Sequence, residues 1–229
     1  MDEHLNAVAE YWDSIAVHYL ELFRNEFQGK PYDRQVITSF AAAMMAGARA
    51  CDAGCGPCGH VTRMLADAGL DVVGVDISPR CIELARQEQP SLRFEVMDMA
   101  GMAFPDGAFQ GLVSYYALHY LPKSRLGGVI REFSRVIRSD GLLLIVAKEG
   151  RGEGWIADPM GSGQQVFWCD FEPNELQTLV AANGFIEVDC QVREPLPDEI
   201  SVRRIYLTAR RAVEMNGAFG QAYGRMGAQ

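Results

Sequence analysis

Residues 49–60, with the sequence RACDAGCGPCGH, constrain the fold of this chain more than any other segment. A short apolar run ends at Asp52 and is followed at once by a loop that contains Gly54, Gly56 and Gly59. A second apolar run, LDVVGVD, ends at another carboxylate, Asp76. Strand, glycine turn, helix, strand and acid in this order are typical of a βαβ unit that binds a nucleoside. Glycine suits the loop because the chain turns tightly there and a ligand approaches the bare backbone.

The carboxylate of Asp52 decides between two kinds of nucleoside ligand. The spacing GCGPCG also fits the G-x-G-x-x-G pattern of NAD-binding folds, in which amide groups and a helix N-terminus cradle a pyrophosphate. An acid at the edge of that cradle repels a pyrophosphate, and Pro57 removes one amide donor. S-adenosylmethionine carries an ammonium and a sulfonium and no phosphate. The sequence therefore favours S-adenosylmethionine as the cofactor.

Length, composition and charge limit the kinds of partner. The chain has 229 residues, 48% of them hydrophobic, which is enough for one sizeable core. A formal net charge of −9 and the absence of any Lys or Arg run argue against a nucleic-acid partner. The acidic N-terminus lacks the apolar segment of a signal peptide, and no apolar stretch approaches the roughly 18 residues of a membrane span. We therefore expect a cytoplasmic protein without a membrane partner, whose oligomeric state the sequence leaves unknown.

Three residues of the glycine segment have the spacing of metal ligands, namely Cys55, Cys58 and His60. A closed zinc site needs four ligands, and the sequence has no second C-x-x-C or His pair. We therefore expect no metal, and we expect the small thiols to fill tight positions around the loop. Six scattered cysteines in a chain without a signal peptide are expected to be reduced.

Apolar periodicity predicts strands that alternate with helices, which is typical of a doubly wound α/β sheet. The predicted strands are 48–52, 71–76, 92–97, 109–114, 142–148, 185–192 and 202–209. The predicted helices are 5–24, 32–45, 60–68, 79–89, 123–138 and 173–182. The segment 148–172 is expected to be irregular, and the last two strands are expected to form an antiparallel pair. The expected fold is Rossmann-like and mostly parallel, with an antiparallel C-terminal strand and N-terminal helices that form a cap.

Taken together, these segments resemble the class I S-adenosylmethionine-dependent methyltransferases, in particular bacterial members that act on small molecules. CDAGCGPCG is similar to the glycine motif of the family, and VVGVDIS is similar to its ribose-binding strand. FEVMDMAGMAFPDGAFQGLVSYYALHYLP resembles the adenine-binding loop and the strand that faces the substrate. REFSRVIRSDGLLLIVAKEG resembles the helix, turn and strand that follow, and VRRIYLTAR resembles the last strand. The resemblance covers residues 5–211.

The resemblance also implies a domain organisation. Residues 1–211 are expected to form a single class I methyltransferase domain. Within it, residues 1–47 are expected to form a helical lid and residues 148–172 a substrate-cap insertion. Residues 212–229 lack a periodic apolar face, and we expect a flexible tail there.

Roles for the glycine segment follow from the resemblance. It implies that Asp52, Gly54 and Gly56 surround the methionyl part of the cofactor, with Asp52 nearest the ammonium. It implies that Asp76 accepts hydrogen bonds from the ribose hydroxyls. Cys58 adds a residue to the family's GCGPG-H pattern. The third glycine of the loop therefore has two open roles, contact with the ligand or room for the helix that follows.

Roles at the adenine end follow in the same way. The resemblance implies that Ile77 packs on the adenine, that Asp98 binds its amino group and that Met99 covers the ring. The alternative for Asp98 is a turn cap, and cofactor binding is preferred because the residue follows a strand at the edge where ligands bind. Tyr115 is expected where the end of its strand meets both cofactor and acceptor. Tyr19 is expected over the cofactor, or only to dock its helix.

His119 and Tyr115 are the candidate catalytic residues. His119 is expected to act as a general base for an acceptor hydroxyl, thiol or amine, because imidazole titrates near neutral pH. The alternative is a histidine at a helix start that bonds to the backbone. The candidate substrate contacts are aromatic residues that are alternatively core or docking side chains: Tyr11, Trp12, Tyr116 and Trp168.

The predicted function is transfer of a methyl group from S-adenosylmethionine to an O, N or S nucleophile of a small molecule. In such an in-line displacement the protein mainly positions the nucleophile and excludes water. The alternatives are an NAD-dependent oxidoreductase and a non-catalytic nucleoside-binding protein on the same fold. No motif identifies the acceptor, and the acidic charge balance slightly disfavours an anionic one.

Overall fold

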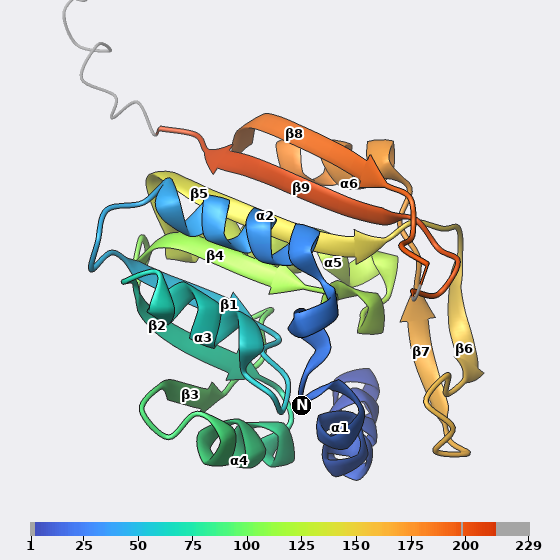
Figure 1. Cartoon of the computed structure of the whole chain (residues 1–229). Helices are drawn as coiled ribbons and strands as arrows, with labels where there is room; N and C mark the ends of the chain where they lie inside the picture. Colours follow the sequence, from blue (N-terminus) through green and yellow to red (C-terminus); the bar gives the residue numbers. More distant parts are fainter. Residues whose placement is uncertain (1–2, 198, 214–229) are drawn as a thin grey trace, which may run out of the picture.

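The centre of the protein is a seven-stranded sheet with the strand order β3-β2-β1-β4-β5-β9-β8 (Figure 1). The computed structural model describes residues 3–197 and 199–213. The sheet strands are β1 (Arg49–Ala53), β2 (Asp71–Asp76), β3 (Arg93–Val96), β4 (Phe109–Tyr115), β5 (Ile137–Lys148), β8 (Phe185–Arg193) and β9 (Arg204–Arg211). Strands β1 to β5 pair in parallel, and β9 is antiparallel to both β5 and β8. The predicted fold class and the antiparallel C-terminal strand are confirmed.

Helices cover both faces of the sheet, which explains why the central strands β1, β2, β4 and β5 contain apolar runs rather than an alternating pattern. The helices are α1 (Glu3–Phe23), α2 (Pro31–Ala42), α3 (His60–Asp67), α4 (Pro79–Glu88), α5 (Lys123–Val136) and α6 (Pro173–Ala181). On one face, α2 and α3 bury Ile37, Phe40 and Leu65 against the sheet (Figure 1). On the other face, α5 and α6 bury Phe133 and Leu176.

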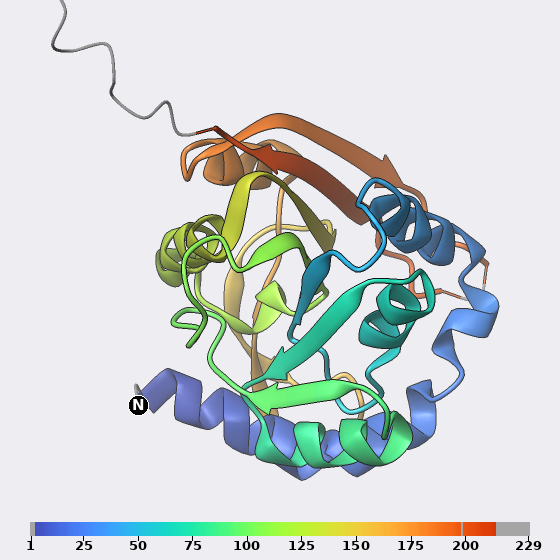
Figure 2. The same ribbon diagram turned by 90° about the vertical axis from the view of Figure 1, so that its left-hand side faces the viewer.

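The helix α1 lies beside α4, away from the two helix-covered faces (Figure 2). Its apolar residues follow the helical spacing of the sequence, and it is joined to α2 by a short 3-10 helix, η1 (Glu26–Gly29). The helix α4 begins where the sequence indicates. Ser78 is the N-cap, its Oγ accepts a hydrogen bond from the Cys81 amide, and Pro79 is the first helical residue.

The segment 148–172, which was expected to be irregular, contains a two-stranded antiparallel sheet. Its strands are β6 (Glu153–Ala157) and β7 (Gln165–Cys169), and they stand beside the main sheet (Figure 1). The prediction was wrong because β6 is largely solvent-exposed and shows no clean alternation of apolar and polar residues. A further short 3-10 helix, η2 (Leu118–Tyr120), packs against β7.

Across residues 3–197 and 199–213, no helix combines the length and the apolar character needed to cross a membrane. The predicted flexible tail, 212–229, lies outside the described residues from position 214 onward.

Candidate cofactor and acceptor site

A cavity of about 430 Å³ lies at the carboxyl ends of β1, β2, β4 and β5. The strand order reverses between β1 and β4, and ligands of open α/β sheets bind at such a switch point. The volume falls in the range of small-molecule sites, roughly 300–1,000 Å³. Aromatic side chains of α1 and η1 border the cavity: Trp12, Tyr19, Phe23 and Phe27.

Asp52, at the end of β1, lines the cavity with a carboxylate that is 1% exposed. Its Oδ2 accepts a hydrogen bond from the Thr62 hydroxyl at 2.6 Å. Within the described part of the chain, its Oδ1 is buried and has no hydrogen-bond partner. Burial raises the pKa of Asp52 to about 7, although the Thr62 hydrogen bond acts in the opposite direction. A buried acceptor without a donor is costly, so this oxygen is suited to a cationic N–H group of a ligand.

The first amides of the glycine loop are engaged within the protein. The amides of Gly54 and Cys55 both donate to the carbonyl of Val75, at 2.8 and 3.0 Å. The amide of Gly56 donates to Oδ2 of Asp76 at 3.0 Å. Three consecutive donors are therefore directed to β2 and its terminal carboxylate. This differs from a cradle in which the loop amides bind a pyrophosphate.

The glycines of the loop are required for two different reasons. Gly54 lines the cavity with φ +84, and a Cβ there would lie 2.2 Å from the Cβ of Ala117. Gly59 has φ +59, and a Cβ there would lie 2.7 Å from the ring of Phe94. Gly59 is not among the residues that line the cavity. The sequence left two roles open for Gly59, contact with the ligand or room for the helix that follows. The geometry supports the second role, because a side chain at this position would prevent α3 from packing on the sheet.

Asp76, at the end of β2, also lines the cavity. Its two oxygens accept backbone hydrogen bonds from Gly56 and Ser78, each at 3.0 Å. Burial raises its pKa. Because a carboxylate oxygen has two lone-pair directions, both oxygens can still accept a further hydrogen bond from a ligand hydroxyl.

Three more residues predicted to bind the cofactor, Ile77, Asp98 and Met99, line the same cavity. Oδ1 of Asp98 accepts a hydrogen bond from the Ala100 amide at 2.8 Å, so this residue does cap a turn. Ile77 and Met99 are partly buried and pack against the core cluster that lies under α5 and α6. The structure thus brings the acidic and apolar members of the predicted cofactor set together around one space.

The three residues with the spacing of metal ligands do not meet in a common site. Cys58 packs with Leu20 and Leu84, and Nε2 of His60 lies 3.0 Å from the carbonyl oxygen of Phe23. Over the residues described, no group of three or more His, Cys, Asp or Glu is placed to hold a metal ion.

Tyr115 and Tyr116, at the end of β4, line the cavity. The hydroxyl of Tyr115 donates to Oδ1 of Asp33 at 2.8 Å, and Asp33 is not among the cavity-lining residues. Tyr115 therefore contributes its ring to the cavity, and its hydroxyl is not available for the predicted catalytic role. Tyr116 has the uncommon φ of 55, and in the described structure its hydroxyl is buried without a hydrogen-bond partner.

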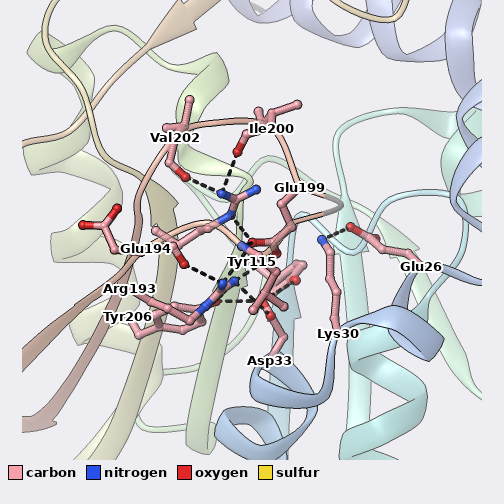
Figure 3. Close-up of polar contacts among 12 residues, drawn as sticks. Glu26, Lys30, Asp33, Tyr115, Arg193, Glu194, Glu199, Ile200, Val202 and Tyr206 are labelled. Atoms are coloured by element: carbon pink, nitrogen blue, oxygen red, sulfur yellow. Dashed lines mark hydrogen bonds and ion pairs between the residues drawn. The ribbon is translucent and has the colours of Figure 1, made fainter.

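A polar network fixes this end of the cavity (Figure 3). Asp33 Oδ1 also accepts a hydrogen bond from the Tyr206 hydroxyl at 3.1 Å. Arg193 donates to both carboxylate oxygens of Glu199, each at 2.9 Å. Glu199 lines the cavity, and Arg193 also lies 3.6 Å from Oδ2 of Asp33, so the network connects Glu199 to α2 and, through Tyr115, to β4.

The prediction that His119 is a general base requires a correction. His119 is fully buried and does not line the cavity. Its Nδ1 lies 2.6 Å from the carbonyl oxygen of Cys169, and its Nε2 accepts a hydrogen bond from the Lys148 amide at 2.9 Å. Burial lowers its pKa to about 3, so the ring is neutral at physiological pH. Both nitrogens are committed, and the alternative of a backbone-bonded histidine fits the geometry.

The aromatic substrate candidates divide into two groups. Trp12, Tyr116 and Trp168 line the cavity. Tyr11 does not: it is 4% exposed and its hydroxyl donates to Oδ1 of Asp158 at 2.7 Å. Tyr11 therefore ties α1 to the loop between β6 and β7, and its predicted contact with substrate is corrected to a structural tie.

Five charged residues that the sequence did not identify also line the cavity: Glu26, Lys30, Lys148, Glu199 and Arg204. Lys148 carried a signal, because it ends the apolar run LLLIVAK just as Asp52 and Asp76 end theirs. The other four residues carried no such signal, because loops and a distant strand bring them to the site.

Comparisons with known proteins agree with this geometry. Residues 50–141 match the family model described as "Methyltransferase domain". The chain is 34% identical over 126 residues to magnesium-protoporphyrin O-methyltransferase of Rhodobacter capsulatus, a match that covers 53% of this chain and 55% of the relative. It is 30% identical over 102 residues to 2-methyl-6-phytyl-1,4-hydroquinone methyltransferase of Synechocystis sp., covering 43% of this chain and 31% of the relative. The chain thus spans only part of the length of these curated relatives.

A solved structure shows the same fold over nearly the whole chain. It is that of 1,6-didemethyltoxoflavin-N1-methyltransferase from Burkholderia thailandensis, with bound 1,6-didemethyltoxoflavin and S-adenosylhomocysteine. The TM-score is 0.70 at 23% sequence identity, and the match covers 93% of this chain and 92% of that chain. The family model and the curated relatives agree with the fold: over residues 50–141 this chain is similar to methyltransferases, and it shares the fold of a solved methyltransferase.

Proposed function

We propose that this protein transfers the methyl group of S-adenosylmethionine to an O, N or S nucleophile of a small molecule. The observation that carries the proposal is the buried Oδ1 of Asp52, a residue that lines the cavity, because this oxygen has no donor in the described structure. An ammonium group placed there supplies both a positive charge and N–H donors. The amino acid end of S-adenosylmethionine has such a group.

The neighbouring residues suit the rest of the cofactor. Asp76 would accept hydrogen bonds from the ribose hydroxyls while keeping its bonds to Gly56 and Ser78. Ile77 and Met99 offer apolar surface to the adenine. Asp98 lines the same part of the cavity and would accept a hydrogen bond from the adenine amino group.

The residues around the cavity would serve catalysis by position and by shielding. S-adenosylmethionine supplies an activated methyl group, so the chain must hold the nucleophile in line with it and exclude water. Aromatic rings of α1, η1 and β4 enclose the space, and such ring faces also attract a cation. With His119 buried outside the cavity, we assign no histidine base, and an amine or an already ionised acceptor needs none.

The two alternatives from the sequence are disfavoured by specific features. An NAD-dependent oxidoreductase requires a phosphate site where Asp52, Asp76 and three engaged amides lie. A non-catalytic nucleoside-binding protein needs no space for an acceptor beside the nucleoside. Here the cavity continues past the cofactor half to Lys148, Trp168 and Arg204.

The proposal is tested by calorimetry with the full chain. We expect S-adenosylhomocysteine to bind with one site per chain, and NAD⁺ to produce no binding heat at the same concentration. Methyl transfer is then followed as S-adenosylhomocysteine formation with panels of small acceptors. Binding of NAD⁺ without binding of S-adenosylhomocysteine would overturn the proposal.

A further inference from the structure

Charged residues change sign along the edge of the sheet that forms the cavity. Asp98 follows β3, Asp76 ends β2 and Asp52 is the last residue but one of β1, and all three line the cavity. Beyond β4, Lys148 ends β5 and pairs in register with Arg204 at the start of β9. Residues opposite each other in an antiparallel pair lie on the same face, and both of these line the cavity. The cavity thus has an acidic half and a basic half, with β1 and β5 two strand spacings, about 10 Å, apart.

The basic half holds one more positive charge than its ion pairs neutralise. Lys30 forms an ion pair with Glu26. Arg204 forms one with Glu199, at 3.4 Å between Nε and Oε2. Among the residues that the structure describes, Lys148 forms neither an ion pair nor a side-chain hydrogen bond. An occupant of this half therefore meets one uncompensated ammonium group.

The surroundings of this ammonium are flat and aromatic. Nζ of Lys148 lies 4.8 Å from the ring centroid of Trp168 and 5.8 Å from that of Tyr116. The buried hydroxyl of Tyr116 is a second polar group without a partner in the described structure. A planar ligand that carries an oxygen would satisfy both groups while contacting the two rings.

Electrostatics around Lys148 favour an anionic occupant. Burial, with the positive charges of Arg204 and Lys30, lowers the pKa of Lys148, while Glu26 and Asp170 act in the opposite direction. An anion bound here restores the stability of the charged ammonium, so binding and charge support each other.

The buried histidine explains why Lys148 is held in this place. His119 accepts a hydrogen bond from the Lys148 amide, and its ring stacks on Trp168 with centroids 4.4 Å apart and an interplanar angle of 8°. Trp168 is fixed on its other side by a 2.7 Å hydrogen bond from Nε1 to Asp170. His119 is thus a positioning residue for the ammonium and for one of the two rings beside it.

We propose that the methyl acceptor is a small planar molecule with one anionic oxygen, a carboxylate or an ionised hydroxyl, and that Lys148 binds this oxygen beside Tyr116 and Trp168. The inference rests on the proposed function, because it assigns the acceptor half of the same cavity. It also revises the expectation from overall composition. The net charge of −9 describes the whole chain, whereas the acceptor meets a local surplus of one positive charge.

The test measures binding to the protein saturated with S-adenosylhomocysteine. The probes are two matched pairs that differ in charge: 4-hydroxybenzoate with 4-hydroxybenzamide, and 4-nitrophenolate with 4-nitroanisole. We expect the anionic member of at least one pair to bind at least about tenfold more tightly, and the pair that responds identifies the group. Lys148→Met should weaken that anion about 10- to 100-fold, and Lys148→Arg should retain most of the affinity.

Two controls make the result decisive. Lys123→Met removes a lysine that pairs with Glu175 outside the cavity and should change nothing. Each variant is checked for unchanged affinity for S-adenosylhomocysteine, and Lys148→Gln replaces Lys148→Met if the latter misfolds. Equal binding of charged and neutral probes in both pairs, or a preference that survives in the Lys148 variant, would overturn the inference. Failure to bind S-adenosylhomocysteine would instead count against the proposed function.

Discussion

At the scale of single residues, the ionisation of Asp52 couples the stability of the folded protein to the binding of a ligand in the cavity. The carboxyl ionises near pH 3.8 when solvated, and burial raises its pKa to about 7 in the folded chain. Because the folded state holds the proton more tightly, ionisation of Asp52 lowers stability as pH rises from about 4 to 7. The loss is fully present above pH 7 and absent below about pH 4. A cationic ligand offsets it, since it favours the charged carboxylate.

The first prediction concerns Asp52→Asn. We expect the ligand-free variant to melt several degrees higher than the wild type at pH 8 and with a much smaller difference at pH 4.5, as followed by scanning calorimetry. Binding of S-adenosylhomocysteine should be lost at pH 8. Asp67→Asn, at an exposed ion pair of α3, is the matched control and should alter neither property. Equal destabilisation at both pH values would contradict this account of Asp52.

The same scale shows what the sequence could and could not predict about the site. Asp52 and Asp76 were predictable, because each ends an apolar strand beside a glycine loop, and the fold brings such ends together. His119 was not, because nothing in ALHYLP indicates that its two ring nitrogens meet the Cys169 carbonyl and the Lys148 amide. Those partners are 50 and 29 positions away along the chain and depend on how β7 and β5 are placed.

At the scale of elements, α1 is held over the cavity from two sides. Oδ1 of Asp13 accepts hydrogen bonds from the Ser78 hydroxyl at 2.5 Å and the Arg80 amide at 3.0 Å, at the start of α4. Toward β6 and β7, Tyr11 donates to Asp158 at 2.7 Å. Trp12, which lies between Tyr11 and Asp13 in the chain, lines the cavity, and so does Tyr19, further along the same helix. The release of α1 would open the cofactor half to solvent.

The second prediction concerns the tie between Tyr11 and Asp158. We expect Tyr11→Phe to accelerate dissociation of S-adenosylhomocysteine about tenfold, because it removes a hydrogen bond to a buried carboxylate. Stopped-flow displacement measures this rate. Tyr32→Phe, which removes an exposed hydrogen bond to Gln191, is the control and should leave the rate unchanged. An unchanged rate in Tyr11→Phe would show that α1 does not gate the cofactor.

The elements themselves were largely predictable from periodicity, with β6 and β7 as the exception. Strands β1, β2, β4 and β5 contain apolar runs because both faces of the sheet are covered there, and their spacing with helices indicates the parallel order. In contrast, Trp155 and Ile156 of β6 are exposed, so apolar residues there do not mark a buried face. Their strand forms because β7 packs on η2 and α1, which is tertiary information.

At the scale of the whole molecule, the cavity joins elements from every part of the chain. Its lining includes α1, the glycine loop, the ends of β2 and β4, and the segment before β9. A ligand that contacts all of them binds the folded state and not the unfolded chain. Its binding free energy therefore adds to the stability of the entire molecule.

The third prediction is a ligand-dependent melting temperature. At a concentration one hundred times its dissociation constant, S-adenosylhomocysteine should stabilise the protein by about 2.7 kcal/mol and raise the midpoint by about 5 to 10 °C. Scanning fluorimetry over a concentration series measures the shift. NAD⁺ should produce none. A shift with NAD⁺ that matches the one with S-adenosylhomocysteine would indicate a site that does not discriminate by charge.

The engaged amides of the glycine loop have a consequence for redesign. Because Gly54, Cys55 and Gly56 direct their N–H groups to Val75 and Asp76, the loop backbone itself is shaped around β2. Neutralising Asp52 would remove a repulsive charge but would free none of these donors. To make this protein bind a pyrophosphate coenzyme, the backbone conformation of the glycine loop would therefore have to be rebuilt. A change of the Asp52 side chain alone would leave the cofactor site empty.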